Sequence, residues 1–211
     1  MNNRIDLKEL ERQAFRTNFQ DGLWDIYLGI FLLMVGASPM LSQSKLAPGW
    51  LLVIIAIFAA AAVLAFLGAK KFIVTPRLGV VKYGPARQQK RKKVTLIMSL
   101  SVLLGLVMLF ATRSAIGLAQ SWELPGWAII AAIFGVQTVL IFSLGAYYMD
   151  YSRAYLYGWL YALALPITFY LMDAGIFIPI GALVFAAGMI LFGLILFIRF
   201  LRQTPLPEVE G

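Results

Sequence analysis

The stretch WLLVIIAIFAAAAVLAFLGA runs from Trp50 to Ala69 without a single charged side chain. An α-helix rises about 1.5 Å per residue, so as a helix this stretch would be about 30 Å long, close to the thickness of the hydrocarbon core of a bilayer. Inside lipid the backbone cannot hydrogen-bond to water, and a helix satisfies its N–H and C=O groups internally. The stretch therefore predicts a membrane-spanning helix.

Five other stretches of the chain are similarly apolar and of similar length. The composition agrees, because 61% of the 211 residues are hydrophobic and only 13% are charged, whereas about a quarter of a soluble domain is charged. Together the stretches predict an all-α integral membrane protein, a bundle of six transmembrane helices. The expected spans are Trp24–Leu41, Trp50–Ala69, Val94–Ala111, Trp127–Tyr148, Ala154–Met172 and Ile176–Ile198.

The basic residues predict how these spans are oriented. With six spans both termini lie on one side, and that side would carry 16 of the 18 Lys and Arg residues, leaving only Lys45 and Arg113 opposite. Cytoplasmic loops are enriched in Lys and Arg, so we expect both termini in the cytoplasm and a multi-pass protein of the cell membrane. The 16 residues are Arg4, Lys8, Arg12, Arg16, Lys70, Lys71, Arg77, Lys82, Arg87, Lys90, Arg91, Lys92, Lys93, Arg153, Arg199 and Arg202.

The same division predicts three parts of the chain. Residues 1–23 form a cytoplasmic amphipathic segment, since Leu7, Leu10 and Ala14 recur at helical spacing among charged residues. Residues 24–198 form the transmembrane domain, which contains a basic cytoplasmic loop at 70–93. Residues 199–211 form a cytoplasmic tail.

A short motif recurs where two spans are expected to begin. PGWLLVIIAIF starts at Pro48 and PGWAIIAAIF starts at Pro125. One interpretation is a two-helix unit repeated three times, which would give three tandem helical hairpins. The alternative is that proline suits any first helical turn and tryptophan any membrane interface, with no repeat implied.

Several kinds of chemistry have no residues to support them. The chain contains no cysteine and no histidine, which removes thiol nucleophiles, imidazole acid–base catalysis and the usual zinc ligands. No Asp, Glu, Lys or Arg lies at the centre of an expected span, where an ionisable residue would mark a transport or proton pathway. We therefore expect no catalytic residue, no metal and no cofactor, and a protein that is not an enzyme.

The segment KYGPARQQKRKKV, residues 82–94, is the most basic part of the chain. Its charges lack interleaved stacking aromatics, so nucleic acid is not an expected partner. Next to a span such charges either orient the helix or hold anionic lipid headgroups, and both interpretations stay open. The residues assigned to a headgroup site are Lys82, Arg87, Lys90, Arg91, Lys92 and Lys93.

Two further groups of polar residues are candidate sites. One lies within the spans and is either the lining of a pore or ligand site, or a set of interhelical hydrogen bonds; it comprises Gln137, Thr138, Ser99, Tyr161 and Thr168. The other lies at the predicted cytoplasmic ends of the spans, where an ion pair or solvated end charges are expected; it comprises Asp21, Asp25, Asp150 and Arg153.

These features favour a non-catalytic membrane protein that binds lipids or assembles with a partner membrane protein or with its own copies. The six-span topology with cytoplasmic termini resembles that of the substrate-capturing subunits of vitamin importers, and this resemblance implies a transporter component as an alternative. A second alternative is an oligomeric channel with its polar lining around Gln137.

Overall fold

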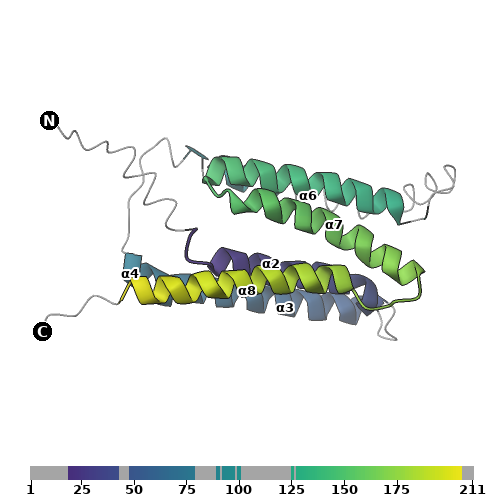
Figure 1. Ribbon diagram of the computed structural model, residues 1–211, viewed down its shortest axis with the longest axis horizontal. Coiled ribbons are helices and arrows are strands. Elements are labelled where there is room, and N and C mark those ends of the chain that lie inside the picture. The colour runs from purple at the N-terminus through teal and green to yellow at the C-terminus, as the bar shows by residue number, and fades with distance from the viewer. Residues whose placement is uncertain are drawn as a thin grey trace, which may run out of the picture. The chain divides into compact units, whose positions relative to one another are not determined.

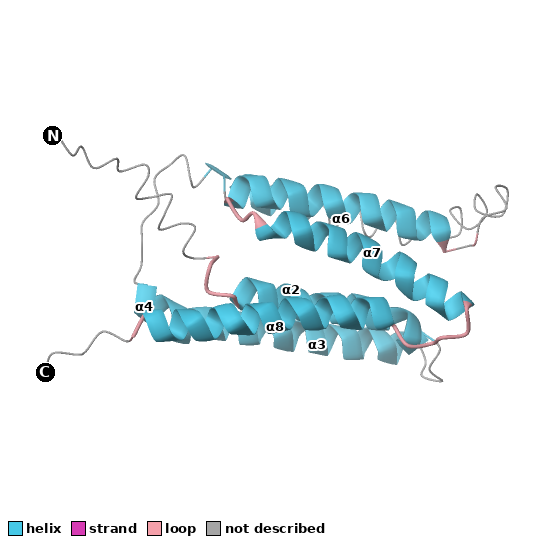
Figure 2. Cartoon of the chain, in the orientation of Figure 1, coloured by secondary structure: helices cyan, strands magenta, loops and turns pink. Residues whose placement is uncertain are grey.

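The computed structural model describes residues 19–42, 48–78, 89–90, 92–97, 99–100, 125 and 127–205. Helices and the loops between them make up this part of the chain, and it contains no strand (Figure 2). The all-α prediction is therefore confirmed. The chain divides into two compact units, the first formed by Met1–Tyr83 with Val184–Gly211 and the second by Gly84–Leu183.

The first unit is built from three long helices, labelled in Figure 1. They are α2 (Leu23–Ser42), α3 (Pro48–Ala69) and most of α8 (Ile180–Gln203). Helix α2 packs against α3 and also lies directly on α8. A Cβ atom added to Gly193 of α8 would be only 2.8 Å from the backbone nitrogen of Ile26. Glycine thus allows the two backbones to approach each other as closely as membrane helices can.

Helix α3 ends at Ala69, where the expected span ends, but the helical structure does not stop there. It continues through a π-helical turn, η1 (Lys70–Val74), into α4 (Thr75–Leu78), so the first nine residues of the expected loop 70–93 are helical. Pro76 explains the wider turn, because its ring lacks an N–H donor and would clash with the carbonyl four residues earlier. The carbonyl of Lys70 instead accepts the amide N–H of Thr75, five residues on.

The second unit contains α6 (Ala128–Met149) and α7 (Arg153–Asp173), which agree closely with the fourth and fifth expected spans. They pack tightly, since a Cβ atom at Gly158 would be 2.9 Å from that of Phe142. Asp150 closes the turn between them with φ 52°, a left-handed conformation that Asp tolerates. At the other end the indole N–H of Trp127 donates to Asp173 at 2.5 Å.

Helix α8 starts and ends later than the sixth expected span. It begins after Pro179 and reaches Gln203, so Arg199 and Arg202 belong to the helix and not to a tail beginning at residue 199. The repeat hypothesis pairs the spans of α7 and α8 in one hairpin, but α7 falls in the second unit and most of α8 in the first. The start of α8 nevertheless lies against α7, since a Cβ atom at Gly181 would be 2.7 Å from the side chain of Ile167. The repeat therefore stays a prediction.

Four helical segments are long and apolar enough to cross a membrane, namely Val53–Leu78, Ala128–Met149, Arg153–Asp173 and Ile180–Gln203. A shorter apolar segment, Leu23–Ala37, lies within α2. The third expected span, Val94–Ala111, falls mostly outside the described residues, as do residues 1–18 of the predicted amphipathic segment. An all-helical chain with four helices that could cross a membrane is thus confirmed, and the count of six spans stays a prediction.

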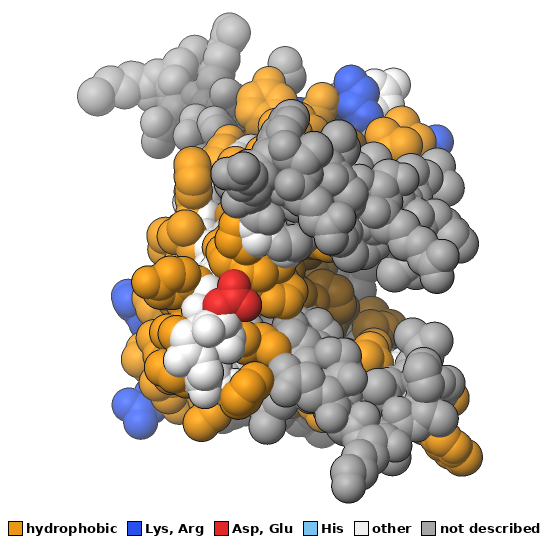
Figure 3. All heavy atoms as spheres, turned by 90° about the vertical axis from the view of Figure 1, so that its right-hand side faces the viewer, with side chains coloured by type: hydrophobic (Ala, Val, Ile, Leu, Met, Phe, Trp, Pro, Cys, Tyr) orange, Lys and Arg blue, Asp and Glu red, His pale blue; other side chains and the backbone are white. Residues whose placement is uncertain are grey.

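The described surface is as apolar as a membrane helix requires. Leu64 of α3 is 69% exposed and Leu191 of α8 is 61% exposed, and many other large apolar side chains are similar. Hydrophobic side chains cover most of the described surface in Figure 3 as well. Contiguous exposed apolar area on this scale is unusual for a soluble monomer and suits contact with lipid chains.

Candidate functional site

Asp21 lies just before α2 and is fully buried. One carboxylate oxygen accepts the amide N–H of Leu23 at 3.1 Å, and the other accepts the ammonium group of Lys70 at 2.5 Å. A carboxylate at this position also suits the positive end of the α2 dipole. Burial raises the pKa of Asp21 above its usual value of 3.8, and the neighbouring Lys70 ammonium opposes that rise.

This ion pair was not predicted from the sequence. Asp21 was expected to be a solvated end charge or a partner of Arg153, whereas its partner is Lys70 and its side chain is inaccessible. Asp25, one turn further along α2, is also fully buried, close to Gly193 of α8. A pair between Arg153 and an acid stays a prediction; the guanidinium of Arg153 lies 5.2 Å from the ring centre of Tyr151.

Arg77 binds the carboxyl-terminal end of α8. Its guanidinium donates to the carbonyl of Thr204 at 3.1 Å and, more weakly, to that of Leu201 at 3.4 Å. The hydroxyl of Thr204 donates to the carbonyl of Phe200 at 2.6 Å. These bonds satisfy carbonyls that the end of a helix otherwise leaves without a donor.

These contacts bring the start of α2, the end of α3–α4 and the end of α8 to one end of the first unit. Leu23, Val74 and Phe200 form a buried apolar cluster there. Every described Lys and Arg of this unit also belongs to one of these segments, namely Lys70, Lys71, Arg77, Arg199 and Arg202. The positive charge of the described residues of the first unit therefore lies at one end.

The second unit is polarised in the same way. The ammonium group of Lys93 lies 5.8 Å from the ring centre of Tyr148, at the end of α6 where Arg153 begins α7. Lys90, Lys92 and Lys93 are exposed, and Asp173 lies at the opposite end of the α6–α7 pair. The structure thus brings Lys93 of the predicted headgroup segment to the α6–α7 turn. Lys82, Arg87 and Arg91 lie outside the described residues.

Two of the polar residues within the helices have hydroxyl groups that donate to backbone carbonyls. The hydroxyl of Thr138 donates to the carbonyls of Phe134 and Gly135, and that of Thr168 donates to the carbonyl of Ala164. These bonds lie within one helix, and the two interpretations of the group, a lining or a set of interhelical hydrogen bonds, stay open. Other members of the group differ in their surroundings: Tyr161 is buried against Phe142, Gln137 is partly buried and Ser99 is exposed.

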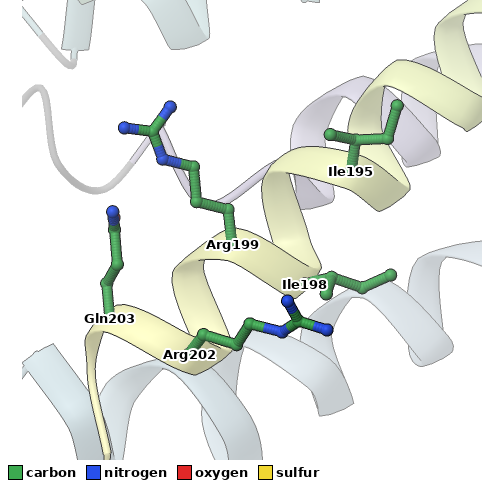
Figure 4. Close-up of a pocket in the computed structure, with 5 residues that line it drawn as sticks. All are labelled: Ile195, Ile198, Arg199, Arg202 and Gln203. Carbon is green, nitrogen blue, oxygen red and sulfur yellow. The ribbon is translucent and has the colours of Figure 1, made fainter.

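An open hollow of about 390 Å³ lies along the last turns of α8 (Figure 4). Ile195, Ile198, Arg199, Arg202 and Gln203 line it. This hollow was not predicted from the sequence, because both arginines were expected at the start of a tail. The signal was nevertheless present, since apolar and basic residues recur at spacings of three and four at the end of the last apolar stretch.

No group of three or more His, Cys, Asp or Glu side chains that would suit a metal ion occurs among the described residues. The chemistry that the described residues do offer is cationic: exposed ammonium and guanidinium groups at the ends of apolar helices. Comparison with known proteins adds no family to this description, since no protein-family model, no curated protein and no solved structure matches the chain.

Proposed function

We propose that this chain is a six-span protein of the cell membrane, with both termini in the cytoplasm, that acts without catalysis as a lipid-binding or assembly bundle. In this proposal the basic end of each unit faces the cytoplasm, and the segment 82–93 holds anionic lipid headgroups. Membrane lipids are the expected partners, together with further copies of the chain or another membrane protein.

The observation that carries this proposal is the contact of Lys93 with Tyr148. It holds the end of the basic segment at the same end of the α6–α7 pair as Arg153. Helix α6 has 22 residues, so about 33 Å of apolar helix separates this end from Trp127 and Asp173. That length matches a bilayer core, and it supports placing the lysines at one headgroup layer.

The expected attraction is large enough to select lipids. A Lys or Arg near an anionic surface contributes about 1 kcal/mol, so the six residues Lys82, Arg87, Lys90, Arg91, Lys92 and Lys93 contribute up to roughly 6 kcal/mol. Crowding of the charges reduces this sum. The attraction is electrostatic, so it weakens as the salt concentration rises.

The test replaces Arg87, Lys90, Arg91, Lys92 and Lys93 with Gln and compares the co-purifying lipids by native mass spectrometry. We expect the anionic fraction to fall in this variant and to stay unchanged in a control in which Lys45 and Arg113, predicted on the opposite side, become Gln. An unchanged anionic fraction with preserved topology would show that the segment only orients the third span.

The transporter and channel alternatives depend on a polar path through the helices. Among the proposed lining residues, Thr138 and Thr168 donate their hydroxyl protons within their own helices, and Tyr161 packs on Phe142 at a ring distance of 4.9 Å. Each hydroxyl oxygen can still accept a hydrogen bond, so both alternatives stay open. The contact of Lys93 with Tyr148 is what supports the lipid-binding or assembly bundle.

A further inference from the structure

The hollow on α8 is built on a single helix face. Ile195, Arg199 and Gln203 follow at intervals of four residues, and Ile198 and Arg202 form a parallel row beside them. In Figure 4 the side chains of Arg199 and Gln203 point to one side, and Arg202 lies next to Ile198. The two isoleucines are 64% and 49% exposed, and each lies one helical turn before an arginine, Ile195 before Arg199 and Ile198 before Arg202.

Both guanidinium groups are available to a ligand. The last carbonyls of α8 accept hydrogen bonds from Arg77 and Thr204, so Arg199 and Arg202 are not needed to cap the helix. Neither forms an ion pair with an acidic residue in the part of the chain that the structure describes, where Asp21 pairs with Lys70. The hollow is therefore a cationic recess at the end of an apolar helix.

We propose that this recess binds one anionic phospholipid. The exposed side chains of Arg199 and Arg202, which point apart in Figure 4, turn toward one phosphate, whose oxygens their forked donors match in pairs. The amide of Gln203 hydrogen-bonds a headgroup hydroxyl, and an acyl chain lies along Ile195 and Ile198. Ile195 and Arg202 are about 10 Å apart along the helix axis, which suits the distance from the phosphate of a lipid to its first chain carbons.

A lipid fits this recess better than free phosphate does. Free phosphate would use the guanidinium groups alone and leave the isoleucines without a role, whereas a phospholipid covers both halves of the recess. The site is distinct from the segment 82–93, which lies largely in the other unit. It rests on the proposed function only in requiring that the basic end of the first unit lie in a headgroup layer.

The test uses the full chain in a non-ionic detergent with added palmitoyl-oleoyl phosphatidylglycerol, and counts bound lipids by native mass spectrometry. The variant Arg199→Gln/Arg202→Gln should lose one bound lipid, with its affinity lowered about tenfold or more, because charge-assisted hydrogen bonds to two arginines are removed. Arg199→Lys/Arg202→Lys, which keeps the charge but not the fork, should bind at an intermediate level. Phosphatidylcholine with the same chains should bind weakly to the unmodified protein.

The matched control is Lys71→Gln/Lys8→Gln, which removes two charges predicted on the same side. It should keep the lipid, and an equal loss there would overturn the site in favour of general charge attraction. Unchanged binding in both arginine variants, or binding of inorganic phosphate as tight as that of the lipid, would also overturn it. The variant with five glutamines at residues 87–93 separates the two proposals. It should keep the lipid bound at α8 even if it loses other lipids, so failure of the proposal for residues 82–93 would not overturn the α8 site.

Discussion

At the scale of single residues, the most consequential feature is the buried pair of Asp21 and Lys70. The carboxylate is fully buried and the lysine side chain is only 16% exposed. Removing one partner of such a pair leaves an uncompensated charge away from water, which costs more than the pair itself contributes. The pair therefore holds α2 and the end of α3 in one arrangement.

We predict that Lys70→Met destabilises the protein by about 3 kcal/mol, and that Asp21→Asn/Lys70→Met recovers part of this loss. The measurement is unfolding in detergent for both single variants and the double variant, read as a double-mutant cycle. Additive effects in the cycle would mean that the two side chains do not interact in solution.

The stability of Lys70→Met should also depend more strongly on pH than that of the unmodified protein. Burial raises the pKa of Asp21, and in Lys70→Met the ammonium that opposes this rise is gone. An acid whose pKa is higher in the folded than in the unfolded protein favours folding at low pH, and this stabilisation is lost as the pH rises through the folded-state pKa. As the pH falls from 7 to 4, the free energy of unfolding of Lys70→Met should therefore rise relative to that of the unmodified protein. A parallel pH dependence of the two proteins would contradict the assignment.

A further residue-scale prediction concerns Gln137, which is partly buried on α6. If it serves only packing, Gln137→Leu should change the free energy of unfolding by less than about 1 kcal/mol. Retained folding together with loss of a bound solute or of conductance would instead favour the transporter or channel alternative.

At the scale of elements, the packing of α2 on α8 depends on glycine. Gly22, Gly29 and Gly193 each leave no room for a Cβ atom, and at Gly22 the atom would lie 2.2 Å from the carbonyl oxygen of Gly193. Gly22 also has φ +79°, which few other residues adopt. Backbone atoms, unlike side chains, cannot rotate away, so the contact fixes how far apart the two helices lie.

We predict that Gly193→Ala destabilises the protein by about 2 kcal/mol, as overpacking does elsewhere. Gly188 provides the control on the same helix, because a Cβ atom there meets nothing within 4 Å. Gly188→Ala should be neutral or stabilising by up to about 1 kcal/mol, since alanine favours helix more than glycine. Equal effects of the two substitutions on thermal unfolding in detergent would contradict the close contact of α2 and α8.

The elements also explain which expectations failed. The ends of α6 and α7 were predictable because the turn at 150–152 interrupts the apolar pattern locally. The continuation of α3 was not, because Thr75-Pro76 signals a helix end, and the π-helical turn that accommodates the proline is a property of the whole backbone. The Asp21–Lys70 pair spans 49 positions in the chain, so no local pattern contains it.

At the scale of the whole molecule, the orientation is the main prediction. The chain lacks cysteine, so single cysteines introduced at Ser44, Gln120 and Asp173 are unique probes. They should react with a membrane-impermeant thiol reagent in intact cells, because we expect them outside. Cysteines at Gln88 and Lys71 should react only after the membrane is permeabilised. Labelling of either one in intact cells would contradict the predicted six-span topology or its orientation.

The direct contact between α2 and α8 has a consequence for synthesis. The two helices are separated by more than 100 residues of chain, yet neither can bury its glycine face without the other. Translation proceeds at about 5–20 residues per second, so α2 waits on the order of 10 to 30 seconds in the membrane before α8 has been made. During that interval Asp25 and Gly29 are not covered by α8. If translation stopped before α8 was made, this polar and glycine-rich face of α2 would stay exposed to membrane proteases.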